Sequence, residues 1–236
     1  MSTQKARIWE LDALRGICIL GMVVVHIFFD LAFFGGMDLG LPAWFDFVQH
    51  YGHVFFVLIS GICATLGSHS FRRGVFVFCA GLLVSYVTLF MDYVIGVSGI
   101  RIWFGILHML GVCMMLYPLF KKLPFWLLGI LGIGFIVLGF WLETVRVSVD
   151  FLFPLGLRSG NIFTGSDFFP IFPGLGWFLF GAGLGKLIYG KKQSLLPKTN
   201  ANQPILRFFR FCGVQSLPIY LLHQPVIALI VVLSCG

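Results

Sequence analysis

Charged side chains are scarce in this sequence. They make up 11% of its 236 residues, against about 25% in soluble domains, and so few cannot cover a globule of this size in water. A soluble domain is therefore excluded, and the hydrophobic content of 59% excludes a disordered chain. The six cysteines form no CxxC pair, so neither a disulfide scaffold nor a metal site is expected. The net charge of +7 comes from scattered basic residues, so no nucleic acid partner is expected either.

Long apolar runs dominate the sequence instead, and the mean hydropathy is +0.99. A membrane-spanning helix needs about 20 mainly apolar residues. These runs are too long and too continuous for barrel strands, which alternate with period two. The sequence therefore predicts an all-α fold, a polytopic membrane helix bundle of about seven transmembrane helices, with residues 1–236 as a single domain. The seven predicted spans are 8–33, 51–68, 74–95, 102–119, 123–142, 169–189 and 212–234.

Basic residues mark alternate connections between the predicted spans. Cytoplasmic loops carry an excess of Lys and Arg, so these connections are expected to face the cytoplasm. The N-terminus is then cytoplasmic and the C-terminus outside, in a multi-pass protein of the cytoplasmic (inner) membrane. The marked connections hold Lys5 and Arg7, Arg72 and Arg73, Lys121 and Lys122, and the group from Lys186 to Arg210.

The first predicted span contains four ionisable residues, Asp12, Arg15, His26 and Asp30. Each costs about 2.5 to 3.5 kcal/mol inside a bilayer, so by default it marks function. At about 100° per residue the four lie within one narrow stripe, which should face the bundle interior. Asp30 lies one turn beyond His26 and could fix the tautomer of its imidazole, so His26 is predicted to be an oriented general base.

Three further histidines fall inside predicted spans, namely His53, His108 and His223. His26 and His108 are expected at similar depth, where they can line one cavity if their spans are neighbours. At the cytoplasmic foot of the bundle, a phosphate-bearing ligand would find its charge matched by Arg15 beside Asp12. The basic residues that border this foot are Arg7, Arg72, Arg73, Lys121 and Lys122.

Several motifs resemble the bacterial DUF1624 family, which is related to the catalytic domain of heparan-alpha-glucosaminide N-acetyltransferase. An arginine followed eleven residues later by a histidine in the first span is also similar to the wider transmembrane acyltransferase superfamily, including the acyltransferase-3 enzymes. The motifs are RIWELDALRG at 7–16, the run from Met22 to His26, Phe28 to Leu31, Phe56 to Gly61, Phe104 to Gly111, and Asp167 to Pro173.

The resemblance implies an acyl-CoA-dependent transmembrane acyltransferase. The donor, expected to be acetyl-CoA, binds from the cytoplasm, and a saccharide or glycolipid acceptor binds on the outer side. By the motif, His26 carries the catalytic role and Arg15 helps to hold the CoA. The separation of these two residues, about 16 Å along a helix, is similar to the length of a phosphopantetheine arm.

Acyl transfer needs a base, donors for the thioester oxyanion and exclusion of water. We predict that His26, oriented by Asp30, is the base. We predict that His108 donates a hydrogen bond to the oxyanion or, alternatively, positions the acceptor. The donor would be held by Arg7, Asp12, Arg15, Arg72 and Arg73, and the acceptor by His53, Asp92, Asp167 and His223.

Two other functions fit the same residues. Histidines that face each other from different helices could ligate a haem in a redox protein. Alternatively, His26 and Asp30 could relay protons in a transporter of a sugar-like substrate. Membrane lipids and a second copy of the chain are the other expected partners.

Overall fold

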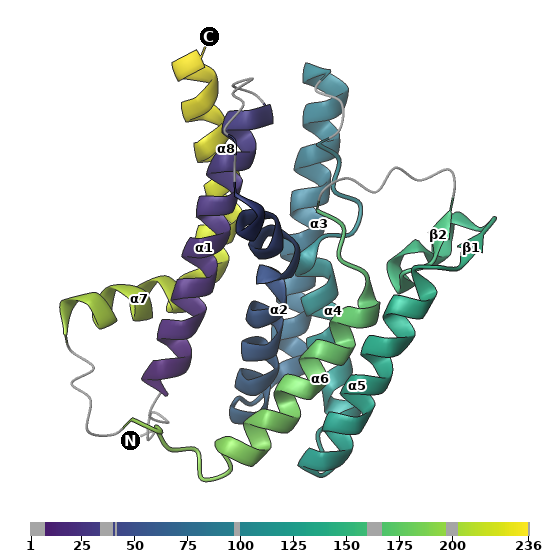
Figure 1. The fold of residues 1–236 in the computed structure, drawn as a ribbon, viewed down its shortest axis with the longest axis vertical. Coiled ribbons are helices and arrows are strands. Elements are labelled where there is room, and N and C mark those ends of the chain that lie inside the picture. The colour runs from purple at the N-terminus through teal and green to yellow at the C-terminus, as the bar shows by residue number, and fades with distance from the viewer. Residues whose placement is uncertain are drawn as a thin grey trace. The chain divides into compact units, whose positions relative to one another are not determined.

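The computed structural model describes residues 8–33, 40, 42–96, 100–159, 167–196 and 203–235. The described chain is almost entirely helical, so the all-α prediction is confirmed (Figure 1). Arg7, predicted to hold the donor, lies outside the described residues. The helices are α1 (Trp9–Phe33), α2 (Ala43–Leu66), α3 (Ser70–Ile95), α4 (Ile106–Phe120), α5 (Phe125–Leu142), α6 (Ile171–Ile188), α7 (Pro204–Val214) and α8 (Ser216–Cys235), with a 3-10 helix η1 (Asp150–Leu155) and two short parallel strands, β1 (Arg146–Val147) and β2 (Arg158–Ser159).

Each of the seven predicted spans contains one helix, but two of these helices differ from a simple crossing. Among the described residues, five helices are long and apolar enough to cross a membrane, or six if α7 and α8 count as one span bent by 83°. Helix α4 has only 15 residues, so it rises about 22 Å and is shorter than the hydrocarbon core of about 30 Å. Which end of the bundle faces the cytoplasm stays a prediction.

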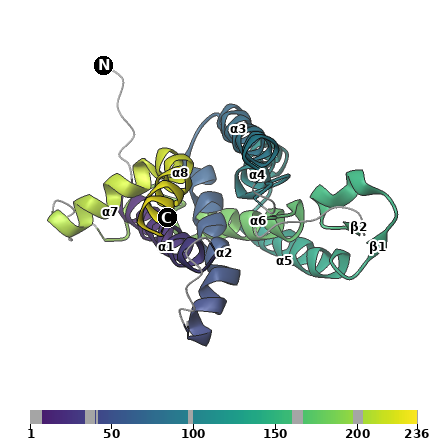
Figure 2. The same ribbon diagram turned by 90° about the horizontal axis from the view of Figure 1, so that it is seen from above.

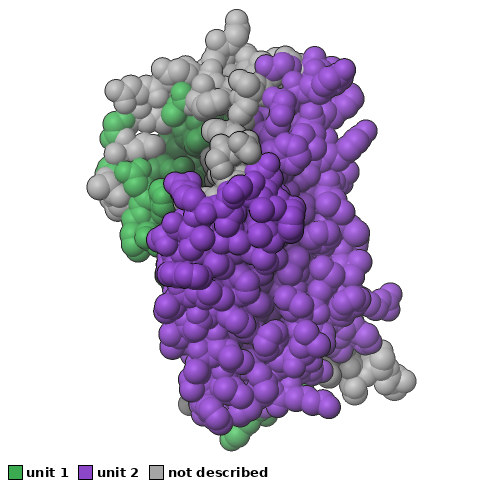
Figure 3. All heavy atoms as spheres, turned by 90° about the vertical axis from the view of Figure 1, so that its right-hand side faces the viewer, with its two compact units in different colours: residues 1–59, 191–236 green, residues 60–190 purple. Residues whose placement is uncertain are grey.

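The chain divides into two compact units, coloured separately in Figure 3, and each is described here by itself. Unit 1 comprises residues 1–59 and 191–236, with α1, the first part of α2, α7 and α8. Unit 2 comprises residues 60–190, with α3 to α6 and the short strands.

In unit 2, α3 packs on α4 and α5 packs on α6, and α4 also contacts α6 (Figure 2). Close approach of α5 and α6 depends on small residues. A Cβ atom on Gly132 would lie 2.8 Å from the backbone nitrogen of Phe180, and one on Gly176 would lie 2.6 Å from that of Ile136. Helices in lipid associate through such packing, because apolar side chains gain little by leaving the acyl chains.

Charged residues lie at both ends of unit 2. Arg72 and Arg73 begin α3, and Lys186 near the end of α6 donates hydrogen bonds to the carbonyl oxygens of Lys121 and Leu123, which follow α4. The opposite ends of α3 and α6 carry acidic residues instead, with Asp92 in the last turn of α3 and Asp167 shortly before α6.

In unit 1, α1 packs against α7 and α8, and α1 and α8 run in the same direction (Figure 1). This shared direction is what an odd number of crossings requires. The crossing of α1 with α7 is very close: a Cβ atom on Gly16 would lie 1.9 Å from the carbonyl oxygen of Phe209, and one on Gly213 would lie 1.7 Å from that of Asp12. Glycine at both positions is therefore what permits this contact.

Helix α7 is amphipathic. Its side chains Ile205, Phe208 and Phe211 are exposed, and Arg207 lies on the side of the helix opposite Ile205. A helix with this distribution is typical of one that lies in the membrane interface, with apolar residues towards the acyl chains and cations among the headgroups. The region was predicted from its arginines to suit a cytoplasmic interface.

Candidate functional site

The polar stripe of α1 faces the other helices of unit 1, as its spacing predicted. Leu14, Ile17, Val24 and Ile27 are exposed on the opposite side of α1, whereas Asp30 is completely buried. Three side-chain contacts join the stripe to α8, and their order along both helices is the same. We call this run of contacts the α1–α8 seam.

The first contact of the seam lies at the start of α8. The guanidinium Nη2 of Arg15 donates a hydrogen bond of 2.8 Å to Oγ of Ser216, which is buried. The Nε atom of Arg15 is also buried and has no hydrogen-bond partner among the described residues. One N–H of the guanidinium is thus available to an anion.

A polar contact outside the seam joins the segment after α6 to the start of α1. Glu10 is buried, and its carboxylate accepts hydrogen bonds from Oγ of Ser194, at 2.9 Å, and from the backbone N–H of Leu195, at 2.7 Å. Hydrogen bonds to an ionised carboxylate are stronger than neutral ones, so this contact holds residues 194–195 against the first turn of α1.

The second contact of the seam is between two histidines. The imidazole rings of His26 and His223 meet edge to face, with centroids 4.9 Å apart and planes inclined by 62°. Nδ1 of His223 lies 2.6 Å from the carbonyl oxygen of Tyr220 on its own helix, while its Nε2 atom is buried and unpartnered among the described residues. His26 and His223, predicted separately as base and substrate ligand, are therefore neighbours.

The third contact involves Asp30, whose partner differs from the predicted one. Nε2 of Gln224 lies 3.0 Å from each oxygen of the Asp30 carboxylate. The expected hydrogen bond from a ring N–H of His26 to the Asp30 carboxylate is not among those of the described residues, and the carboxylate instead accepts from the amide of Gln224. The Oε1 atom of Gln224 is buried and unpartnered in the same region.

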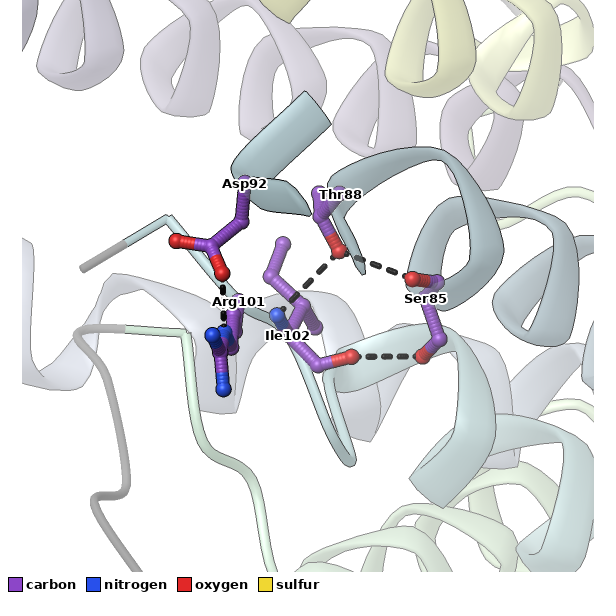
Figure 4. A network of polar contacts seen from close by, with 5 residues as sticks. All are labelled: Ser85, Thr88, Asp92, Arg101 and Ile102. Atoms are coloured by element: carbon purple, nitrogen blue, oxygen red, sulfur yellow. Dashed lines mark hydrogen bonds and ion pairs between the residues drawn. The ribbon is translucent and has the colours of Figure 1, made fainter. Parts of the chain in front are cut away.

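In unit 2, polar side chains gather around the irregular segment that precedes α4. Residues 100–105 are not helical, and their backbone groups need partners because water is scarce at membrane depth. Ser85 donates from Oγ to the carbonyl oxygen of Ile102 at 2.6 Å, and Thr88 accepts from the Ile102 N–H at 3.2 Å (Figure 4). The hydroxyl of Thr88 in turn donates to the carbonyl oxygen of Ser85.

His108 belongs to this same cluster. Its side chain is buried between Phe78 of α3 and Phe104, and its Nδ1 accepts a hydrogen bond of 3.2 Å from the N–H of Gly105. In the neutral ring Nε2 then carries the hydrogen, and it lies 3.5 Å from Oγ of Ser85. These contacts join α3 to the segment before α4. His108 lies in unit 2, and His26 lies in unit 1.

The two acids predicted to hold the acceptor lie beside the same segment. Asp92 forms an ion pair with Arg101 (Figure 4). Asp167 lies against Gly105, where a Cβ atom would come within 3.1 Å of its Oδ2 atom. The sequence predicted both acids at the outer rim, and the structure brings both to one end of unit 2.

Four further predicted site residues lie on α1, α2 and α3. Arg72 and Arg73 are exposed in the first turn of α3, in unit 2. His53 is half-buried on α2, and Asp12 lies on α1 where its carbonyl oxygen faces Gly213. Among the described residues, no group of three or more His, Cys, Asp or Glu side chains is arranged to hold a metal ion.

Sequence reasoning missed two residues of the seam, Ser216 and Gln224. Both are polar side chains on the predicted seventh span that do not ionise, whereas the histidine of that span was chosen because it can. The signal available was the pair of neighbouring polar residues His223 and Gln224 in an otherwise apolar run.

Comparison with known proteins adds one finding. Residues 7–225 match the family described as heparan-alpha-glucosaminide N-acetyltransferase, catalytic. No curated protein and no solved structure gives a significant match. The matched range contains the whole of the α1–α8 seam as well as the cluster around His108.

Proposed function

Because the chain belongs to the heparan-alpha-glucosaminide N-acetyltransferase catalytic family, a family of membrane acetyltransferases, we propose that it transfers an acetyl group across the membrane. The donor is acetyl-CoA, bound from the cytoplasm. The acceptor is a hydroxyl or amine of a saccharide, or of another envelope molecule, on the outer side.

The α1–α8 seam is the observation that supports this proposal. Helix α1 is continuous from Arg15 to His26, and these residues are about 16 Å apart along its axis. Arg15 offers an unpartnered N–H near the start of α8, and His26 meets His223 further along the same two helices. A CoA whose phosphates bind at Arg15 can extend its pantetheine arm along the seam, so that its thioester lies at the two histidines.

The chemistry needs a base beside the thioester and little water around it. Imidazole is the side chain most often used as a general base, and apolar walls protect a thioester from hydrolysis. In the proposal His26 lines the reaction centre. Asp30 acts on it indirectly, since its bond to Gln224 holds α8, and hence His223, against α1.

The remaining predicted residues keep supporting roles in the proposal. Arg7, Asp12, Arg72 and Arg73 contribute to donor binding at the cytoplasmic face. Asp92, Asp167 and His53 bind acceptor hydroxyls. His108 serves as a hydrogen-bond donor through Nε2, for which its neutral tautomer is suitable.

The test is an acetyl-transfer assay on the full chain reconstituted in lipid vesicles. Acetyl-CoA labelled in the acetyl group is supplied on one side and an amino sugar or a neutral sugar on the other. We expect label in covalent linkage to the sugar. His26→Ala should lower the rate of transfer per folded molecule, because its ring lines the reaction centre. Exposed His50, also in unit 1, provides the matched control His50→Ala, which should keep full activity.

Two results would overturn the proposal. Movement of an unmodified sugar, coupled to protons and independent of acetyl-CoA, would show a transporter. An absorption spectrum of bound haem would show a redox protein, although the direct contact between the rings of His26 and His223 leaves no room for a porphyrin between them. Full activity in His26→Ala would remove His26 from the mechanism without removing the reaction.

A further inference from the structure

The tautomer of His223 follows from its hydrogen bond. Its Nδ1 lies 2.6 Å from the carbonyl oxygen of Tyr220, and a carbonyl oxygen can only accept. Nδ1 must therefore carry the hydrogen, and the neutral ring has its lone pair on Nε2. His108 has the reverse arrangement, because its Nδ1 accepts from the N–H of Gly105. The two histidines are thus prepared for opposite roles, buried His108 to donate and half-buried His223 to accept.

The Nε2 atom of His223 is buried without a partner among the described residues. Leaving a buried acceptor unsatisfied costs about 1 to 3 kcal/mol, so such an atom calls for an explanation. The neighbouring Gln224 has the same feature. Its NH₂ group must face the Asp30 carboxylate, because an oxygen there would be repelled, and its Oε1 atom is left buried and unpartnered.

Two unpartnered acceptors on adjacent residues indicate which substrate binds beside them. The reacting end of a thioester has a carbonyl oxygen and a sulfur, neither of which can donate a hydrogen bond. A sugar hydroxyl or an amine has the O–H or N–H that these two atoms lack. This end of the seam is therefore suited to the acyl acceptor.

From these contacts we infer that His223 is a catalytic residue, the general base that takes the proton of the acceptor through Nε2. The inference rests on the proposed function and refines it, because it moves the role of base from His26 to His223. The hydroxyl oxygen or amine nitrogen forms a bond to the acetyl carbonyl carbon, and its proton passes to Nε2 of His223. The carbon–sulfur bond breaks, and the CoA thiolate receives the proton back from the imidazolium.

The bond to Tyr220 supports this role in both protonation states. In the imidazolium both nitrogens carry hydrogens, and Nδ1–H continues to donate to the same carbonyl oxygen. The ring therefore need not rotate between accepting and releasing the proton. His26 lies edge to face with this ring and therefore borders the same reacting position.

The informative variant is His223→Asn. An asparagine NH₂ can take the place of Nδ1 and keep the bond to Tyr220, but it supplies no base at the position of Nε2. We expect kcat with a sugar acceptor to fall by about 10²- to 10⁴-fold, with an unchanged melting curve and an unchanged KM for acetyl-CoA. A wild-type kcat in this variant would overturn the inference.

A second acceptor separates loss of the base from loss of binding. The thiol of a thiosugar is ionised far more readily than a hydroxyl, so its attack does not require a base. With this acceptor, the kcat of His223→Asn should be within about tenfold of the wild-type kcat, because the substitution removes only the proton transfer. An equal loss with both acceptors would mean that His223 merely binds the substrate, and would also overturn the inference.

One measurement does not depend on activity. Nitrogen NMR of the full chain with labelled histidine, assigned by the signal lost in His223→Asn, reports which ring nitrogen carries the hydrogen. We expect Nδ1–H for His223. A hydrogen on Nε2 would exclude the proposed role even in an active enzyme. Failure of the wild type to transfer acetyl groups at all would instead count against the proposed function, whatever the tautomer.

Discussion

The α1–α8 seam and the cluster before α4 use polar side chains in different ways. In unit 2, Ser85, Thr88 and His108 bond the backbone of the irregular segment before α4, so the polar atoms of both partners are satisfied. In unit 1, the α1–α8 seam joins its helices but leaves Arg15 Nε, His223 Nε2 and Gln224 Oε1 buried and unpartnered. The first pattern holds a fold together, and the second has capacity for a ligand. Whether the ring nitrogens of a histidine have hydrogen-bond partners therefore indicates a ligand site better than the number of histidines does.

The largest expected effect comes from breaking the seam itself. Asp30→Ala removes the acceptor of the Gln224 amide, and we expect the free energy of unfolding to fall by about 1.5 to 3 kcal/mol, the usual contribution of a hydrogen bond to a charged group. Denaturation of the purified protein in mixed micelles measures this change.

Asp30→Asn is the matched control, since its Oδ1 atom still accepts from Gln224 and most of the stability should return. If Asp30→Ala unfolds at the same denaturant concentration as the wild type, the bond contributes nothing to holding α8 against α1. The seam would then differ from the cluster before α4 in contributing no measurable stability through this bond.

A smaller effect is expected from Thr88→Val in unit 2. The substitution nearly preserves shape but leaves the N–H of half-buried Ile102 without its acceptor, which should cost about 0.5 to 1.5 kcal/mol of unfolding free energy. Acetyl transfer per folded molecule should not change, because Thr88 serves only the backbone. Melting curves and the transfer assay, made on one preparation, test both statements.

Thr144→Val is the control for this variant. Thr144 bonds the carbonyl oxygen three residues earlier, as Thr88 does, but it is exposed and holds no loop. Thr144→Val should therefore leave the melting curve unchanged. A loss of activity per folded Thr88→Val molecule would mean that the segment before α4 takes part in the reaction.

The smallest effect is expected from Arg101→Gln. Arg101 pairs with Asp92, but its own side chain is 52% exposed, and pairs with a solvated partner contribute about 1 kcal/mol or less. We expect a small fall in melting temperature that disappears in high salt, because salt screens exposed charges. Exposed Arg146 lies at the same end of unit 2 and provides the control Arg146→Gln. A large, salt-independent loss would show that the pair is buried in the membrane.

Much of the helical architecture could be predicted because apolar length is a direct property of the chain. The polar stripe on α1 followed equally directly from its spacing, which depends on helix geometry alone. Helix α4 was harder to predict. The apolar run continues through residues 102–105, and only tertiary hydrogen bonds from Ser85, Thr88 and His108 allow that stretch to remain non-helical.

The partner of Asp30 could not be predicted for a related reason. His26 is one turn away on the same helix, whereas Gln224 is 194 residues away in the sequence. Periodicity describes which residues share a face of one helix, but it says nothing about which side chain of another helix meets them. The choice between His26 and Gln224 depended on the packing of α8, which no local pattern encodes.

The close crossing at Gly16 and Gly213 has a consequence for how the protein sits in its membrane. We expect α7, as an amphipathic helix, to lie in the plane of the headgroups, and Gly16 lies directly against its Phe209 carbonyl. Helix α1 can therefore neither sink nor rise without carrying α7 out of that plane. A thinner or thicker bilayer would have to be accommodated at the far end of α1 by tilt or local deformation of the lipid. Arg15, next to the crossing, then keeps its depth from one membrane to another.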